Sequence, residues 1–155
     1  MGIQIRYNDD SYKKIAPASF VRSYLKAVCN ELDLGNVSFS VSFVSSAEIQ
    51  QINKEYRNID SPTDILSFAI NDMEGEDGFI LPKAKTLNIG DMLICQEEMK
   101  NNAQSFNVPE EEELRRLLIH GVLHLSGRDH KTNNVDEPML REQERILKKL
   151  SEQGL

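Results

Sequence analysis

Hydrophobic and polar residues alternate most regularly at residues 37–44, where the sequence reads VSFSVSFV. Successive side chains of a β-strand point to opposite faces of the sheet, so a period of two predicts a strand with one buried face. Shorter apolar runs bounded by glycine, proline or polar residues predict three more strands. These strands are expected at residues 3–7, 64–70 and 87–95.

Two segments in the first half of the chain carry apolar residues three and four positions apart, which is the spacing of one helix face. The first segment follows Pro17 and is expected to end near Gly35. The second begins with Ser45 and Glu48, which form a capping-box pattern, and extends through Tyr56. Both segments are therefore predicted to be helices with one apolar face.

The second half of the chain contains a strong helix start at Pro109. Proline is tolerated in the first turn, and the glutamates that follow it complement the positive end of the helix dipole. This helix is predicted to run to about Ser126 and to pack on the sheet as the central helix. Its apolar stripe consists of Leu114, Leu117, Leu118, Gly121 and Leu125. A last helix is predicted after Pro138, with apolar positions Met139, Leu140, Ile146, Leu147 and Leu150.

The order of these elements predicts an α+β fold. A length of 155 residues and a hydrophobic content of 39% fit one core, so residues 1–155 are expected to form a single domain. We expect a four-stranded mixed sheet packed with about five helices. The helix that follows Pro109 would then lie at the centre of the molecule.

The net charge of −7 is unevenly distributed along the chain. Residues 61–110 carry three basic and nine acidic side chains, and much of this acidity lies in NDMEGEDGF at residues 71–79. This segment is predicted to be a solvated loop, so the net charge does not exclude an anionic substrate. The basic residues are scattered, which argues against a nucleic-acid binder of the ordinary kind with a basic stripe.

Composition also bears on the location of the protein and on its thiols. No stretch approaches 18 uninterrupted apolar residues, and the N-terminal sequence MGIQIRYNDD lacks the basic-then-apolar order of a signal peptide. We therefore expect a cytoplasmic protein without a membrane segment. Cys29 and Cys95 lie in separate apolar segments, which indicates reduced buried thiols rather than a disulfide framework.

The most informative segment is HGVLHLSGRDH at residues 120–130, because it contains all three histidines of the chain. His120 and His124 are four residues apart, so on a helix both imidazoles lie on one face, roughly 6 Å apart. Gly127 can adopt the left-handed conformation that ends a helix, which would let His130 approach as a third ligand. Three neutral imidazoles leave one tetrahedral position of zinc open, as in catalytic sites.

This pattern favours one zinc ion per chain, although histidines at a helix end also stabilise the helix dipole without a metal. The spacing matches the metzincin proteases, whose motif is HExxHxxGxxH. In those enzymes the glutamate after the first histidine is the general base. Here that position is Gly121, which carries no group able to transfer a proton. Peptide hydrolysis by the metzincin mechanism is therefore disfavoured.

The same residues resemble the YbeY endoribonucleases, whose hallmark is HGxLHLxGxDH, and every specified position matches at residues 120–130. Two further segments are similar to this family, YRNIDSPTDILSF at residues 56–68 and GDMLIC at residues 90–95. The departures are Ile65, where the family has valine, and the acidic segment at residues 72–77. The resemblance covers about residues 45–147.

The resemblance implies a zinc-dependent enzyme that cleaves single-stranded RNA. It also implies a role in small-subunit ribosomal RNA maturation and ribosome quality control, with the small ribosomal subunit and its assembly factors as partners. His120, His124 and His130 become the zinc ligands, and the first two are also counted with the catalytic residues. Arg57 becomes the principal catalytic partner.

Phosphodiester chemistry agrees with this role for Arg57. Charge develops on the nonbridging oxygens during cleavage, and a guanidinium can meet two of them with parallel hydrogen bonds. Arg57 is expected in a loop outside the metal motif, where Pro62 restricts Ser61 and rigidifies the chain. Without the resemblance, Arg57 would be interpreted as a surface residue at a helix end.

Four other residues are secondary candidates. Asp129 directly precedes His130 and is expected either to orient an imidazole or to cap backbone amides. Thr63, Asp64 and Asp91 lie in the two other segments that resemble the family.

Two alternative functions stay open at this point. One is a zinc peptidase related to the metzincins, with its general base supplied from elsewhere in the chain. The other is a nonenzymatic ribosome-assembly factor whose metal is structural. The second alternative predicts that replacing the histidines unfolds the protein while replacing Arg57 changes nothing.

Overall fold

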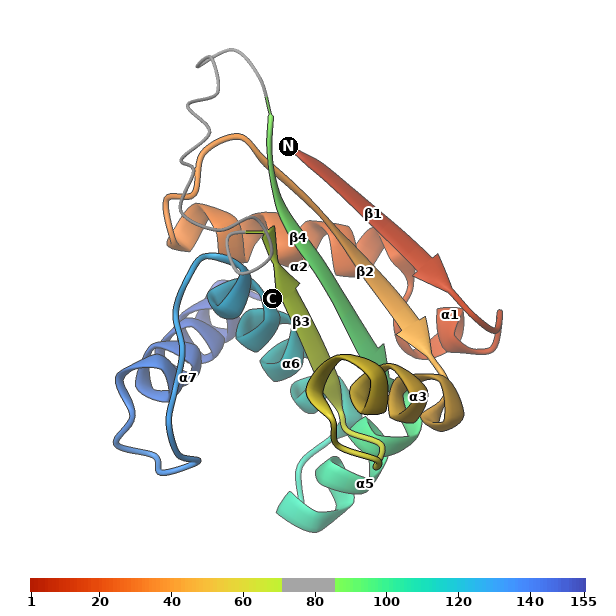
Figure 1. Cartoon of the computed structure of the whole chain (residues 1–155). Coiled ribbons are helices and arrows are strands. Elements are labelled where there is room, and N and C mark those ends of the chain that lie inside the picture. The colour runs from red at the N-terminus through yellow and green to blue at the C-terminus, as the bar shows by residue number, and fades with distance from the viewer. Residues whose placement is uncertain (71–85) are drawn as a thin grey trace.

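The computed structural model describes residues 1–70 and 86–155, so the predicted acidic loop at residues 71–79 lies outside the described residues. The described residues form one four-stranded sheet in the order β1-β2-β4-β3 (Figure 1). Strands β1, β2 and β4 are parallel, and β3 pairs with β4 in the antiparallel sense. The predicted mixed sheet is therefore confirmed. The strands are β1 (Gly2–Tyr7), β2 (Val37–Val44), β3 (Ile65–Ala69) and β4 (Leu87–Cys95).

Six helices occur within the described residues, against the expected number of about five, and the predicted α+β class is confirmed. In Figure 1, α2 and α6 lie behind the sheet, and α3 crosses in front of one end of it. The helices are α1 (Tyr12–Ile15), α2 (Ala18–Glu31), α3 (Ser46–Arg57), α5 (Gln96–Phe106), α6 (Glu110–Leu125) and α7 (Pro138–Glu152).

The alternation in β2 divides its side chains between the two faces of the sheet. Phe39, Val41 and Phe43 belong to the main hydrophobic core, on the side of the sheet that packs against the helices. Ser42 alternates with these residues and lies partly exposed on the opposite face. This strand has the single apolar face that its sequence predicts.

Helix α6 is the central helix, as expected. It packs against β3 and β4 and also contacts α2, α5 and α7. Its apolar residues extend beyond one stripe, because a helix with packed neighbours on several sides buries more than one face. Its largest fully buried side chains are Leu114, Leu118, Ile119, Leu123 and Leu125.

Local backbone geometry explains where α2 and α3 begin and end. The Ser45 hydroxyl accepts a hydrogen bond from the Glu48 amide at 3.3 Å, which confirms that Ser45 caps α3. The expected end of α2 near Gly35 is wrong, because the helix ends at Glu31. Asp33 already adopts a left-handed φ of 52°, and the chain turns there before it reaches Gly35.

Gly90 marks a close approach between β4 and β3. Its φ of 134° is unfavourable for other residues, and a Cβ atom at this position would lie 2.1 Å from the Phe68 carbonyl oxygen. Only glycine fits here, which keeps β3 tightly against β4. This pairing holds β3 beside the end of α6, where the histidines lie.

The remaining predictions about the fold concern thiols and membrane segments. Cys29 and Cys95 are buried and free, as predicted, and burial raises the pKa of the Cys29 thiol to about 11. None of the helices in residues 1–70 and 86–155 has the length and apolar character needed to cross a membrane.

Candidate metal centre and adjoining cleft

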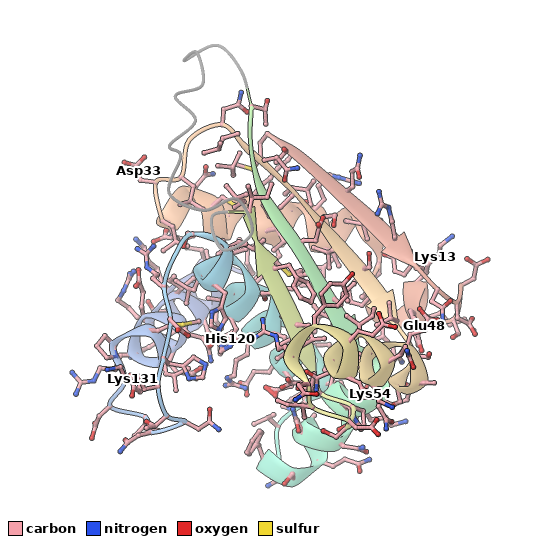
Figure 2. The ribbon with its side chains drawn as sticks, viewed as in Figure 1. Lys13, Asp33, Glu48, Lys54, His120 and Lys131 are labelled. Carbon is pink, nitrogen blue, oxygen red and sulfur yellow. The ribbon has the colours of Figure 1, made fainter. Side chains whose placement is uncertain are left out.

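His120 and His124 lie on one face of α6 near its C-terminal end. Their ring centroids are 4.7 Å apart, which is the separation that a spacing of four helical residues gives. Figure 2 shows the side chain of His120 on α6, on the side of the helix that lies beside the sheet. Both side chains are partly buried and line the cleft beside them.

A glycine turn brings the third histidine to the other two. Gly127 has a φ of 98°, and the Arg128 amide donates a hydrogen bond back to the Leu123 carbonyl at 3.0 Å. This left-handed turn ends the helix in the predicted manner. The ring of His130 then lies 5.2 Å from that of His120 and 5.5 Å from that of His124. One candidate ligand nitrogen from each histidine lies within 4.8 Å of the other two.

Hydrogen bonds determine which nitrogen of each ring faces this point. His120 Nδ1 lies 2.7 Å from Gln143 Oε1, and His130 Nδ1 lies 2.8 Å from the Thr132 carbonyl oxygen. These oxygens can only accept, so both Nδ1 atoms must carry the proton. Nε2 of His120 and Nε2 of His130 are then left with free lone pairs, and His124 Nε2 lies 3.1 Å from His120 Nε2, within hydrogen-bond distance.

The surroundings also keep the imidazoles neutral. Burial lowers the pKa of His120. Burial also lowers the pKa of His124 to about 4, and the nearby rings of His120 and His130 act in the same direction. Neutral imidazole is the form that binds metal ions, so both side chains are ready ligands at neutral pH.

The donor set fits a divalent transition metal. Three imidazole nitrogens that converge on one point are a usual ligand set for zinc, and three protein ligands leave a fourth tetrahedral position open. Hydrogen bonds to the outer nitrogen, as at His120 and His130, are typical of histidines that bind metal. The three-histidine cluster can therefore hold a metal ion.

Arg57 is the last residue of α3, so its expected position in a loop is wrong. The helix extends this far because Asn58 adopts a left-handed φ of 59°, and its amide donates to the Lys54 carbonyl at 3.2 Å. Arg57 Nη2 donates to the Ser67 carbonyl oxygen at 3.0 Å, and the guanidinium lies 5.7 Å from the centroid of the Phe68 ring. The side chain is exposed.

A cleft of about 520 Å³ is lined by His120, His124 and Arg57. One wall is α6, with His120 and His124, and the other is the end of α3, with Arg57. A second hollow of about 680 Å³, which extends over the open face of the sheet, shares Arg57 with the cleft. Arg57 therefore stands between the two hollows.

Of the secondary candidates, Thr63 and Asp129 line the cleft, whereas Asp64 and Asp91 do not. Asp129 Oδ1 accepts from the His130 amide at 2.8 Å and lies 3.9 Å from His124 Nδ1, too far for a hydrogen bond. It therefore caps the backbone and does not orient the imidazole. Thr63 lines the cleft, and Asp64 accepts a hydrogen bond from Asn102 at 2.8 Å. Asp91 is exposed, bonds to Ser40 and does not line the cleft.

Gly121 does not face the cleft. A Cβ atom at this position would lie 2.6 Å from Met92 Sδ and 3.2 Å from Ile65 Cδ1, so the position is directed at the sheet. The residue that corresponds to the metzincin glutamate is thus packed against β3 and β4. The cleft receives no general base from this position.

Gln143 contacts a histidine of the candidate metal centre, and the sequence analysis does not predict this contact. It lies on α7, is 6% exposed and contacts His120. The available signal was a glutamine within the apolar stripe that Met139, Ile146 and Leu150 form on this helix. Sequence alone does not show which residue such a polar side chain meets.

Comparison with known proteins identifies consistent similarities. The family model described as "Endoribonuclease YbeY" matches residues 3–151. A protein of the same name from Treponema denticola is 39% identical over 145 residues, which cover 94% of this chain and 90% of that protein. Another from Halalkalibacterium halodurans is 43% identical over 119 residues, which cover 73% of this chain and 72% of that protein.

A solved structure is also similar. The solution structure of TM1509 from Thermotoga maritima matches with a TM-score of 0.62 and 26% identity. The match covers 97% of this chain and 90% of that one. The arrangement of helices and strands is therefore shared across nearly the whole chain.

Proposed function

The chain belongs to the endoribonuclease YbeY family, and from this membership we propose that it is a zinc-dependent endoribonuclease that cleaves single-stranded RNA. The observation that carries the proposal is the convergence of three imidazoles, two of which line one cleft together with Arg57. A metal site and a guanidinium are suited to an anionic phosphodiester, whereas the cleft receives no acidic side chain from position 121.

In this proposal His120, His124 and His130 hold one zinc ion per chain. When bound, the ion would supply a Lewis acid at the scissile phosphate. The helix and the turn after it hold the backbone of the three histidines, and hydrogen bonds to Gln143 and to the Thr132 carbonyl hold the outer nitrogens of His120 and His130. Burial lowers the pKa of His120 and of His124, which favours the neutral form of both side chains that binds a metal ion.

Arg57 binds the phosphate and stabilises the charge that develops on its nonbridging oxygens. A guanidinium has five N–H donors, and the hydrogen bond to the Ser67 carbonyl uses one of them. The remaining donors are free to form a two-pronged contact with phosphate oxygens. Exposure of the side chain at the end of α3 keeps it accessible to a large substrate.

The position of Arg57 between two hollows supports single-stranded RNA as the substrate. A flexible strand can follow the path from the cleft onto the open face of the sheet while its phosphate contacts Arg57. Unpaired bases can splay apart and contact polar and aromatic side chains along such a path.

The biological part of the proposal comes from the family resemblance. We propose that the enzyme acts in the cytoplasm on small-subunit ribosomal RNA during its maturation and in ribosome quality control. Its partners would be the small ribosomal subunit and the assembly factors bound to it.

The test combines metal analysis with three digests. Purified protein is incubated with a single-stranded fragment of small-subunit ribosomal RNA, with a duplex of the same sequence and with casein. We expect about one zinc ion per chain, cleavage of the single strand only, and loss of cleavage in His124→Ala. Cleavage of casein that depends on His124 would instead identify a peptidase. A protein that binds zinc, cleaves nothing and unfolds when the histidines are replaced would be an assembly factor.

A further inference from the structure

Gln143 is a polar side chain in an apolar environment. It is 6% exposed and lies on the face of α7 that packs against α6. Burying an amide costs free energy unless both its carbonyl and its NH₂ group find partners. The contacts of Gln143 therefore show which hydrogen bonds offset the free-energy cost of burying its amide.

Both ends of the amide have partners. Gln143 Oε1 lies 2.7 Å from His120 Nδ1, and Gln143 Nε2 donates to Glu144 Oε2 at 3.1 Å. Glu144 is held in turn by Arg116 through two hydrogen bonds of 2.9 and 3.1 Å. Arg116 also donates at 3.1 Å to Glu113, which is 2% exposed on α6. A continuous polar chain thus runs from α6 through α7 and back to His120.

This chain fixes the direction of the amide. Burial opposes ionisation of Glu144, but hydrogen bonds from Arg116 and Gln143 hold the pKa of its carboxyl below the ordinary value. An ionised carboxylate only accepts, so the NH₂ group of Gln143 must face Glu144 and the carbonyl must face His120. His120 then has to carry its proton on Nδ1, which leaves the Nε2 lone pair directed at the other two histidines.

We propose that Gln143 is a positioning residue for the metal site, which sets the tautomer and ring orientation of His120 through Glu144 and Arg116. The inference rests on the metal site of the proposed function but does not depend on RNA being the substrate. It also explains why a glutamine suits this position. The neutral amide accepts from Nδ1 without adding a negative charge beside the three imidazoles.

The decisive variant is Gln143→Met, which has a similar volume, suits the apolar stripe and removes the hydrogen-bond acceptor. Gln143→Glu keeps an acceptor at the same place and serves as the rescue. The matched control is Gln104→Leu, because Gln104 is exposed on α5 and lies outside this polar chain.

Two measurements follow. Nitrogen-15 NMR of the metal-free protein reports the tautomer of each histidine, and competition with a chromophoric chelator reports zinc affinity. In Gln143→Met we expect His120 to lose its uniform Nδ1-protonated state and zinc affinity to fall about 10-fold or more. Gln143→Glu should keep the tautomer but recover only part of the affinity, because it loses the NH₂ group that donates to Glu144, and Gln104→Leu should match the parent.

An unchanged His120 tautomer together with zinc affinity within twofold of the parent in folded Gln143→Met would overturn the proposal. If that variant does not fold, Glu144→Gln provides the test, because it weakens the orientation of the amide but leaves Gln143 in place. We then expect a smaller loss of affinity in the same direction, and no loss would overturn the proposal. A parent protein that binds no zinc would contradict the proposed function, whereas the tautomer measurement would still test Gln143.

Discussion

The two walls of the cleft are built in different ways. On the α6 wall, His120 is partly buried and its outer nitrogen is hydrogen-bonded to a buried side chain of α7. On the α3 wall, Arg57 is exposed and, among residues 1–70 and 86–155, its side chain donates one hydrogen bond, to a backbone carbonyl. The side chain on the α6 wall is held in place without a substrate. The side chain on the α3 wall keeps N–H donors available for a substrate. The comparison separates residues that form the metal site, such as His120, from Arg57, which lies beside the site without forming it.

This difference has an energetic basis. Buried polar groups must form hydrogen bonds to offset their loss of hydration. When one partner is removed, the remaining group stays buried without a hydrogen bond, which destabilises the protein. An exposed guanidinium has water as an alternative partner. Substitutions on the α6 wall should therefore change metal content or stability, while substitution of Arg57 should change cleavage alone.

The largest effect is expected when the α6 side of the cleft loses its ligands. In the triple variant His120→Ala, His124→Ala and His130→Ala, metal content should fall from about one ion per chain to none, and RNA cleavage should fall by about 1000-fold. Elemental analysis and a single-stranded RNA digest measure the two quantities. A triple variant with full metal content would end the zinc hypothesis.

Gly121→Glu tests how tightly the α6 wall is packed. The first atom of the new side chain would lie 2.6 Å from Met92 Sδ, and its carboxylate would be forced against the sheet. We expect the free energy of unfolding to fall by about 3 kcal/mol or more, without any gain of peptidase activity. Urea denaturation and a casein digest provide the measurements. A folded variant with robust proteolysis would favour the metzincin mechanism.

Arg57→Ala tests the other wall. Metal content and melting temperature should stay nearly unchanged, while RNA cleavage should slow at least about tenfold, equivalent to about 1.4 kcal/mol of transition-state stabilisation. Arg57→Lys should recover only part of the rate, because lysine keeps the charge and loses the planar fork. Arg145→Ala is the matched control, since Arg145 is exposed on α7. Equal cleavage by the parent and Arg57→Ala, in nuclease-free preparations, would remove Arg57 from the mechanism.

The smallest predicted effect is a pH dependence of the α6 wall without metal. The pKa of His124 is about 4 in the folded protein and about 6.5 when unfolded, so the unfolded chain binds protons first as the pH falls. The contribution of neutral His124 to the free energy of unfolding should therefore be fully present above about pH 6.5 and should decrease between about pH 6.5 and 4. In the presence of a chelator, the melting temperature between pH 7.5 and 5 should drop by about 3 °C more in the parent than in His124→Gln. Identical drops would show that His124 is not responsible.

Sequence reasoning succeeded where one short segment determines the structure. The alternation in β2 directly reflects strand geometry, and the spacing of His120, His124 and Gly127 contains the helix, its end and the turn. The fold of α6 as a central helix also follows from its apolar content. These features depend on local periodicity and backbone preference, which are readable without a partner.

The sequence does not predict features that depend on residues far apart in the chain or on an uncommon backbone angle. Helix α5 was not predicted, because its buried residues are only Met99 and Ala103 and its other positions are polar. The role of Gln143 depends on the packing of α7 against α6. Arg57 was assigned to a loop because nothing in the local pattern shows that Asn58 adopts a left-handed conformation. In each case the missing information is a three-dimensional neighbour or an uncommon backbone angle.

The contact between Arg57 and Ser67 also affects the border of the sheet. Among the described strands, β3 lies at one end of the sheet order, and this side of it faces the cleft. An unpaired strand border is a template for another extended polypeptide, which binds by continuing the ladder of backbone hydrogen bonds. Arg57 already donates to the Ser67 carbonyl, one of the acceptors of β3. In the proposed function the same guanidinium would bind a phosphate, and its hydrogen bond to Ser67 would occupy a backbone acceptor that an added peptide strand needs.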